Sequence, residues 1–202
     1  MRVGLDFDNT IVEYDALFHR VALEGNAIDS SVPVSKVAVR DYLRRQGKED
    51  FWTEMQGRVY GARMSEATAF AGIVDVLRRA IAAGHTLYIV SHKTKYPFLG
   101  PAYDLHAAAE AWITKNLHDS IGPLIPDGQI YFELTKELKL QRIAKLQCDV
   151  FVDDLPEILL SSDFPRTTQP VLFDPENRQS ESHPSAFTVI RRWDELEKCL
   201  SR

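Results

Sequence analysis

The chain has 202 residues, of which 45% are hydrophobic and 26% charged, a composition typical of one globular domain or of one core with a small insert. Its net charge of −5 gives no electrostatic attraction for nucleic acid or an anionic membrane, and no apolar run approaches the ~18 residues of a membrane span. Two cysteines do not make a disulfide framework, and because Met1 and Arg2 lead straight into the first predicted strand, we expect no signal peptide. We therefore expect a cytoplasmic protein.

Strand and helix patterns alternate along most of the chain. Apolar runs predict strands at 2–7, 86–92, 129–134 and 148–154, followed by short strands at 170–175 and 187–190. Helical spacing predicts helices at 71–84, where Gly84 is the stop, and at 102–117, 136–147 and 192–202. Residues 176–185 read as a polar loop. This alternation predicts an α/β fold: a Rossmann-like, three-layer parallel sheet with helices on both faces.

Residues 12–68 interrupt the alternation. No strand pattern occurs there, and three helical stretches do: one around Tyr14–Val21, one from Ser35 to Gly47 and one around Phe51–Val59. We therefore predict a small helical cap at 13–67, inserted into a core made of residues 1–12 and 68–202.

Polar side chains follow the apolar strands where each one ends. Asp6 and Asp8 follow the first strand, Ser91 closes the second and Asp153-Asp154 closes the fourth. In open parallel sheets, ligands bind at the carboxyl ends of the strands, so these side chains are expected in one crevice. Side chains two apart in a strand point to the same side, so Asp6 and Asp8 would repel each other unless a cation lies between them.

Lys139, near the start of the helix that precedes the fourth strand, is expected to reach the same crevice. Carboxylate oxygens favour a hard cation such as Mg²⁺, and Mg²⁺ with a lysine and a serine hydroxyl forms a phosphate-binding set. One carboxylate can then attack phosphorus to form an aspartyl phosphate, while the second transfers protons.

The sequence resembles the haloacid dehalogenase superfamily of phosphohydrolases. Its first motif, D-x-D-x-T/V, corresponds to Asp6-Phe7-Asp8-Asn9-Thr10, and its second to Ser91 in "LYIVSH". The third, a lysine followed by apolar residues at +4 and +7, fits Lys139 with Ile143 and Leu146; Lys136 fits the same offsets and is the fallback. The acidic pair of the fourth motif corresponds to Asp153-Asp154 in "VFVDDLPE".

The resemblance implies a Mg²⁺-dependent phosphatase that hydrolyses a small phosphomonoester, such as a sugar phosphate or nucleotide. It assigns Asp6 as the nucleophile, Asp8 as the general acid/base, and Ser91 and Lys139 as catalytic residues. The implied metal ligands are Asp6, the backbone carbonyl of Asp8, and Asp154 with Asp153 beside it. Asn9 and Thr10 in the first motif, and His92 and Lys93 after Ser91, are candidates for substrate contacts.

Three alternatives remain open. A receiver-like phosphoacceptor domain combines similar residues, but its acidic pair precedes the acceptor aspartate, whereas here the pair comes last. A catalytically silent binding domain of the same fold usually lacks one of the catalytic side chains, and here all are present. A phosphotransferase or phosphomutase would share these residues, and only its products would distinguish it.

Overall fold

The computed structural model describes residues 1–178 and 186–201, so most of the predicted loop at 176–185 lies outside the described residues. The chain forms two compact units. The first consists of Met1–Ile11, Ala69–Lys93 and Leu117–Arg202, and the second of Val12–Thr68 and Thr94–Asn116. Within the described part of the chain, no helix is long and apolar enough to cross a membrane.

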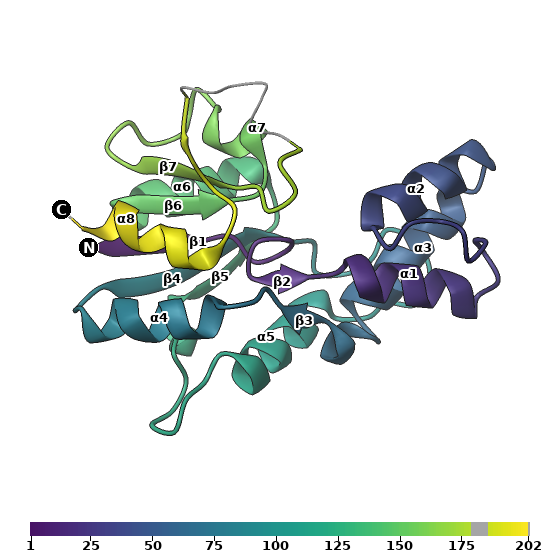
Figure 1. The fold of residues 1–202 in the computed structure, drawn as a ribbon, viewed down its shortest axis with the longest axis horizontal. Coiled ribbons are helices and arrows are strands. Elements are labelled where there is room, and N and C mark those ends of the chain that lie inside the picture. The colour runs from purple at the N-terminus through teal and green to yellow at the C-terminus, as the bar shows by residue number, and fades with distance from the viewer. Residues whose placement is uncertain (179–185, 202) are drawn as a thin grey trace. The chain divides into compact units, whose positions relative to one another are not determined.

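A six-stranded parallel sheet forms the centre of the first unit (Figure 1). Its strand order is β5 (Ile130–Glu133), β4 (Thr86–His92), β1 (Arg2–Leu5), β6 (Val150–Asp153), β7 (Gln169–Phe173) and β8 (Thr188–Ile190). The prediction of an α/β fold with a parallel sheet is confirmed. β4 and β5 lie on one side of β1, and β6, β7 and β8 lie on the other, so the strand order reverses at β1. At such a point the loops that follow the two neighbouring strands lead away from each other.

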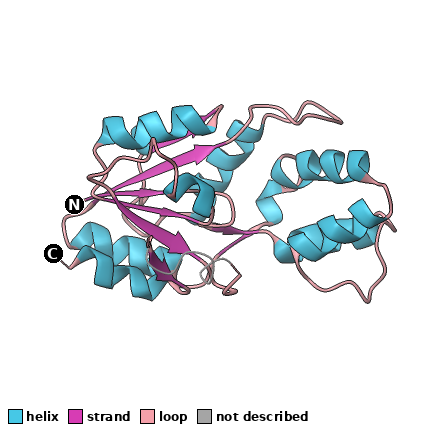
Figure 2. Cartoon of the chain, turned by 90° about the horizontal axis from the view of Figure 1, so that it is seen from above, coloured by secondary structure: helices cyan, strands magenta, loops and turns pink. Residues whose placement is uncertain are grey.

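Helices cover both faces of this sheet (Figure 2). On one face α4 (Ile73–Ala82) packs against α8 (Glu197–Leu200), and on the other α6 (Lys136–Leu146) packs on β4 and β5 while α7 (Pro156–Leu159) packs on β6 and β7. Gly84, the predicted stop, has a φ of 80° two residues after α4 ends, a conformation that glycine adopts without strain. The helix predicted at 192–202 is instead a 3₁₀ turn, Trp193–Leu196, followed by α8.

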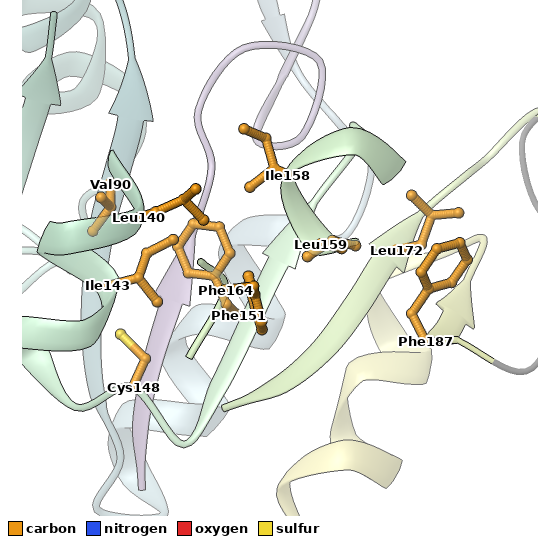
Figure 3. Close-up of a cluster of buried hydrophobic side chains, with 10 residues drawn as sticks. All are labelled: Val90, Leu140, Ile143, Cys148, Phe151, Ile158, Leu159, Phe164, Leu172 and Phe187. Atoms are coloured by element: carbon orange, nitrogen blue, oxygen red, sulfur yellow. The ribbon is translucent and has the colours of Figure 1, made fainter. Parts of the chain in front are cut away.

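The apolar layer beneath α6 and α7 joins residues far apart in the sequence (Figure 3). Phe151 of β6 lies at its centre and is fully buried, with Leu140 and Ile143 of α6 on one side and Ile158 and Leu159 of α7 on the other. This packing fixes α6 against the strand that precedes Asp153. It therefore determines where the side chains on the first turns of α6 point.

Three helices make up most of the second unit: α1 (Asp15–Glu24), α2 (Lys36–Arg45) and α3 (Glu49–Tyr60). Their core is aromatic, with Phe18 against Trp52 and Tyr60 at centroid distances of 5.0 and 5.5 Å. Two short strands, β2 (Val12–Glu13) and β3 (Thr68–Ala69), pair where the chain enters and leaves the insert. The sequence showed no strand there, because two residues cannot display a period of two.

The second unit also takes in residues 94–116, which we had expected in the core. The helix α5 (Leu105–Asn116) packs on α3 and on the 3₁₀ turn Met64–Glu66. Its Trp112 indole Nε1 donates to the Ala67 carbonyl at 2.9 Å. Helical periodicity predicts that such a helix buries one face but does not identify the neighbour that covers it.

Candidate active site

The acids of the first motif lie beyond β1 rather than within it. β1 ends at Leu5, and the Asp6 amide continues the ladder by donating to the Val152 carbonyl at 2.8 Å. The chain then turns, with Asn9 in the left-handed region at a φ of 59°, which asparagine tolerates better than most residues. The predicted strand therefore ends at Leu5, before Asp6 and Asp8, and Asn9 has a conformational role in the turn that follows both acids.

The Asp6 carboxylate receives two buried donors on one oxygen. Ser91 Oγ donates to Oδ1 at 2.8 Å, and Lys139 Nζ contacts the same oxygen at 2.6 Å. All three side chains are almost completely buried. Ser91 comes from β4, next to β1, so the parallel register brings it beside Asp6 as the strand ends predicted.

Lys139 reaches the site because of how α6 begins. Thr135 is the N-cap, and its hydroxyl accepts from the Leu138 amide at 3.2 Å, which places Lys139 in the first turn. Its ammonium also contacts Asp153 Oδ2 at 2.6 Å. Lys136, the fallback, pairs with the exposed Glu157 at 2.6 Å instead.

Asp153 is fully buried and has a partner on each oxygen. Lys139 contacts Oδ2, and the Leu155 amide donates to Oδ1 at 3.0 Å in the turn after β6. Burial raises the pKa of Asp153, Lys139 opposes this shift, and the nearby Asp6 carboxylate adds to it. Burial alone would lower the pKa of Lys139, but Asp153 and Asp6 outweigh burial and raise it, so the lysine is held as the cation.

Three carboxylates form a cluster that suits a divalent cation. Asp6, Asp153 and Asp154 each offer an oxygen, and these oxygens lie within 4.8 Å of one another. When ionised, the three acids carry three negative charges, and Lys139 neutralises one of them. An all-oxygen set with two uncompensated charges is the chemistry that Mg²⁺ prefers, so these residues fit that ion.

Thr10 lies inside this cluster. Its hydroxyl is 3.5 Å from Asp6 Oδ2 and 3.4 Å from Asp154 Oδ1, and the residue is fully buried. At these distances the hydrogen bonds are weak, but they tie the end of β1 to the turn after β6. We had predicted that Thr10 contacts substrate; in the structure its hydroxyl lies between the Asp6 and Asp154 carboxylates.

Asp8 has its own cation. Lys93 Nζ contacts its two carboxylate oxygens at 2.9 and 2.6 Å, and Lys93 is 4% exposed. The sequence predicted that Lys93 contacts substrate; in the structure its ammonium is engaged with Asp8. Its neighbour His92, also predicted to contact substrate, is half-buried with Nε2 3.1 Å from the Leu134 carbonyl. Burial lowers the pKa of His92.

A signal for the Lys93–Asp8 pair was available in the sequence. Ser91 and Lys93 are two apart where a strand ends, and side chains at that spacing point to the same side. If Ser91 faces the first motif, Lys93 should face it too. No comparable pattern marks Thr10, because its contacts depend on the turn around Asn9.

Solved structures with this architecture are numerous, although their sequences are remote. A hydrolase from Deinococcus radiodurans R1 with bound phosphate and sodium aligns over 99% of this chain and 94% of its own, at 18% identity and a TM-score of 0.59. The fold is that of the haloacid dehalogenase superfamily. A predicted phosphoglycolate phosphatase from Haemophilus somnus 129PT aligns over 98% and 97% of the two chains, at 14% identity and a TM-score of 0.58.

A third hydrolase with this fold, from Bacillus subtilis with bound magnesium, aligns over 100% and 98% of the two chains, at 14% identity and a TM-score of 0.55. A dehalogenase is also among the similar structures. No protein-family profile matches the sequence, and no curated protein sequence is significantly similar. The fold by itself therefore leaves the reaction to be argued from the site.

Proposed function

We propose that this protein is a Mg²⁺-dependent phosphatase of the haloacid dehalogenase superfamily, acting on a small phosphomonoester through an aspartyl phosphate on Asp6. The observation that carries the proposal is the Asp6 carboxylate, held by Ser91 and Lys139 beside the Asp153–Asp154 pair. A buried carboxylate with fixed orientation is suited to attack on phosphorus, because little reorganisation precedes bond formation.

In the first step an Asp6 oxygen forms a bond to phosphorus while the bond from phosphorus to the leaving oxygen breaks. Asp8, which has to enter this step protonated on one oxygen, gives that proton to the leaving oxygen. In the second step water attacks phosphorus, Asp8 takes a proton from the water, and the bond between phosphorus and Asp6 breaks to release phosphate and regenerate the carboxylate.

Ser91 and Lys139 are proposed to stabilise the negative charge that develops on the phosphoryl oxygens, since each is a donor directed at the Asp6 carboxylate. Asp6, Asp153 and Asp154 would hold Mg²⁺, which when bound supplies positive charge to the phosphoryl group. Asp154 is the best direct ligand, because it is partly exposed whereas Lys139 and the Leu155 amide occupy both oxygens of Asp153.

Asp8 favours a phosphatase over a dehalogenase. The leaving group of a phosphate ester is an alkoxide, which needs a proton, whereas a halide leaves without one. The dehalogenase branch of the superfamily lacks the second acid of the first motif, and here that acid is present and held in place by Lys93. The helical second unit is proposed as the cap that selects a small substrate.

The test is phosphate release from a panel of about a hundred phosphorylated metabolites, with and without Mg²⁺. We expect turnover of a sugar phosphate or nucleotide that a chelator abolishes and that Asp6→Asn reduces to background. Mass spectrometry of acid-quenched enzyme should find the phosphoryl group on Asp6. Turnover that persists in excess chelator would contradict the metal assignment, and transfer of phosphate to a second metabolite would identify a phosphotransferase.

A further inference from the structure

The ion pair between Lys93 and Asp8 is built more tightly than a surface pair. The Lys93 ammonium contacts both oxygens of the carboxylate, at 2.9 and 2.6 Å, and the exposed fractions of the two side chains are 3% and 19%. A buried ammonium whose partner is removed is costly, so each side chain restricts the other. Contact with both oxygens fixes the plane of the carboxylate as well as its position.

The backbone and the surrounding rings fix Lys93 in turn. Its amide donates to the Glu133 carbonyl at 2.8 Å, which extends the pairing of β4 with β5 by one residue. Its ammonium lies 5.7 Å from the centroid of the Phe7 ring, and Phe7 packs edge-to-face on Phe132 of β5. The Lys93 ammonium therefore packs on the Phe7 ring, which in turn packs on Phe132 at the end of the sheet.

Two lysines thus serve the two acids of the first motif. Lys139 from α6 contacts Asp6 and Asp153, whereas Lys93 from the end of β4 contacts Asp8. The contacts of Lys139 place it with the reacting carboxylate and the metal cluster. Those of Lys93 place it with the carboxylate that would move protons.

We propose that Lys93 is a positioning residue, which holds the Asp8 carboxylate in one orientation for proton transfer and does not itself contact the substrate. This rests on the proposed function, because Asp8 has that role only in phosphoryl transfer. Without Lys93, the Asp8 side chain would be free to adopt other rotamers, and the geometry of proton transfer would be lost. Substrate binding, which does not use Lys93, would be unchanged.

A double-mutant cycle tests this role. Lys93→Met, Asp8→Asn and the double variant are compared with wild type on an alkyl phosphate and on nitrophenyl phosphate, with the first chemical step measured by rapid mixing. Loss of general acid catalysis typically costs ~10²–10⁴-fold, and a misplaced acid should cost ~10–10²-fold. We expect Lys93→Met to slow the alkyl ester more than the nitrophenyl ester, whose leaving group needs little protonation, and to leave KM unchanged.

The decisive quantity is the cost of Lys93→Met once Asp8 is already asparagine. A residue that acts through Asp8 has nothing left to position, so the second substitution should cost less than about threefold, and Lys93→Arg in the wild-type background should recover part of the activity. Costs that multiply in the double variant, or a raised KM with an unchanged kcat, would mean that Lys93 contacts substrate directly and would overturn the proposal.

Crystal structures of wild type, Lys93→Met and Lys93→Arg, none of which depends on turnover, provide a second test. We expect Asp8 to keep the paired orientation in wild type and in Lys93→Arg, and to leave it in Lys93→Met. An Asp8 carboxylate that stays in place without Lys93 would overturn the positioning role alone. A wild-type enzyme without Mg²⁺-dependent phosphatase activity would instead overturn the proposed function.

Discussion

At the level of single residues, lysines from two different elements offset the cost of gathering carboxylates at one end of a sheet. The sequence suggested that a cation was needed between Asp6 and Asp8, because it placed both in one strand. In the structure each acid has an ammonium of its own, Lys139 for Asp6 and Lys93 for Asp8. The acids that could hold a metal ion are then a different set: Asp6, Asp153 and Asp154.

Substitution of the two candidate lysines of the third motif distinguishes them. Lys139→Met removes the only cation that contacts both Asp6 and Asp153 among the described residues, and it removes the proposed donor to the phosphoryl group. Losing one such donor typically costs ~10²–10³-fold in kcat, and breaking a buried pair costs about 3–5 kcal/mol of stability. Steady-state kinetics and urea unfolding measure the two effects.

Lys136→Met is the matched control, three residues earlier in α6. Its pair with Glu157 is exposed, and such pairs contribute about 0–1 kcal/mol, so we expect turnover and stability close to wild type. Lys139→Arg retains the positive charge, and it provides a second measurement if Lys139→Met does not fold. A severe loss in Lys136→Met with little loss in Lys139→Met would move the third motif to the start of the helix.

At the level of elements, the apolar patterns predicted the strands and most helices well, because each buries one or two faces against the sheet. They did not show that residues 94–116 pack with the insert. The contact that makes this packing close is at Gly57 in α3, where an added Cβ would lie 2.6 Å from Pro97 Cβ. In the sequence this contact shows only as a glycine in the middle of a helix. The residue that leaves no room for a larger side chain there, Pro97, lies 40 residues away.

Gly57→Ala measures how firmly the segment around Pro97 packs on α3. Alanine favours a helix over glycine by about 1 kcal/mol, whereas overpacking costs about 1–3 kcal/mol, so we expect a net loss of stability. Gly25→Ala, in the same unit, is the control, since its Cβ would meet atoms only at 3.5 Å and beyond. Urea unfolding compares the two; a stabilised Gly57→Ala would mean that Pro97 does not rest on the helix.

At the level of the whole molecule, the strand ends predicted which residues meet, but not how each is held. Asp6, Ser91 and Asp153 converge because β4, β1 and β6 are neighbours, which follows from the alternating pattern and the reversal of strand order. The contacts of Thr10 and Lys93 depend on the turn after β1 and on the layer of Phe7 and Phe132, neither of which has a periodic signature.

The buried thiol of Cys148 predicts how stability depends on alkaline pH. Burial raises its pKa to about 12, above the ordinary value of 9.0, so above about pH 9 the unfolded chain loses a proton that the folded chain retains. Stability therefore falls as pH rises. Cys148→Ala lacks this effect, and between about pH 8 and 10.5 the stability advantage of wild type over it should shrink by about 2 kcal/mol.

The measurement is the free energy of urea unfolding of both proteins under reducing conditions at each pH. Other groups titrate in this range, but they are common to both proteins and cancel in the difference. A difference that stays constant with pH would mean that the thiolate forms as easily in the folded protein as in the unfolded chain.

The acidic cluster predicts that Mg²⁺ stabilises the folded protein, whichever substrate it uses. Folding brings Asp6 and Asp154 together from positions 148 residues apart, and the unfolded chain has no such site. An ion that binds only the folded state adds about 2.7 kcal/mol at a concentration 100 times its Kd.

Asp154→Asn removes one charged ligand, while its side-chain carbonyl can still accept from Thr10. We therefore expect this variant to lose most of the Mg²⁺-dependent rise in Tm and to be slightly more stable than wild type without metal, because one repulsive charge is gone. Asp163→Asn, an exposed acid of the same unit, should respond to Mg²⁺ as wild type does. Equal rises in Tm for wild type and Asp154→Asn would place the ion outside this cluster, since a site built from three carboxylates cannot lose one and bind as before.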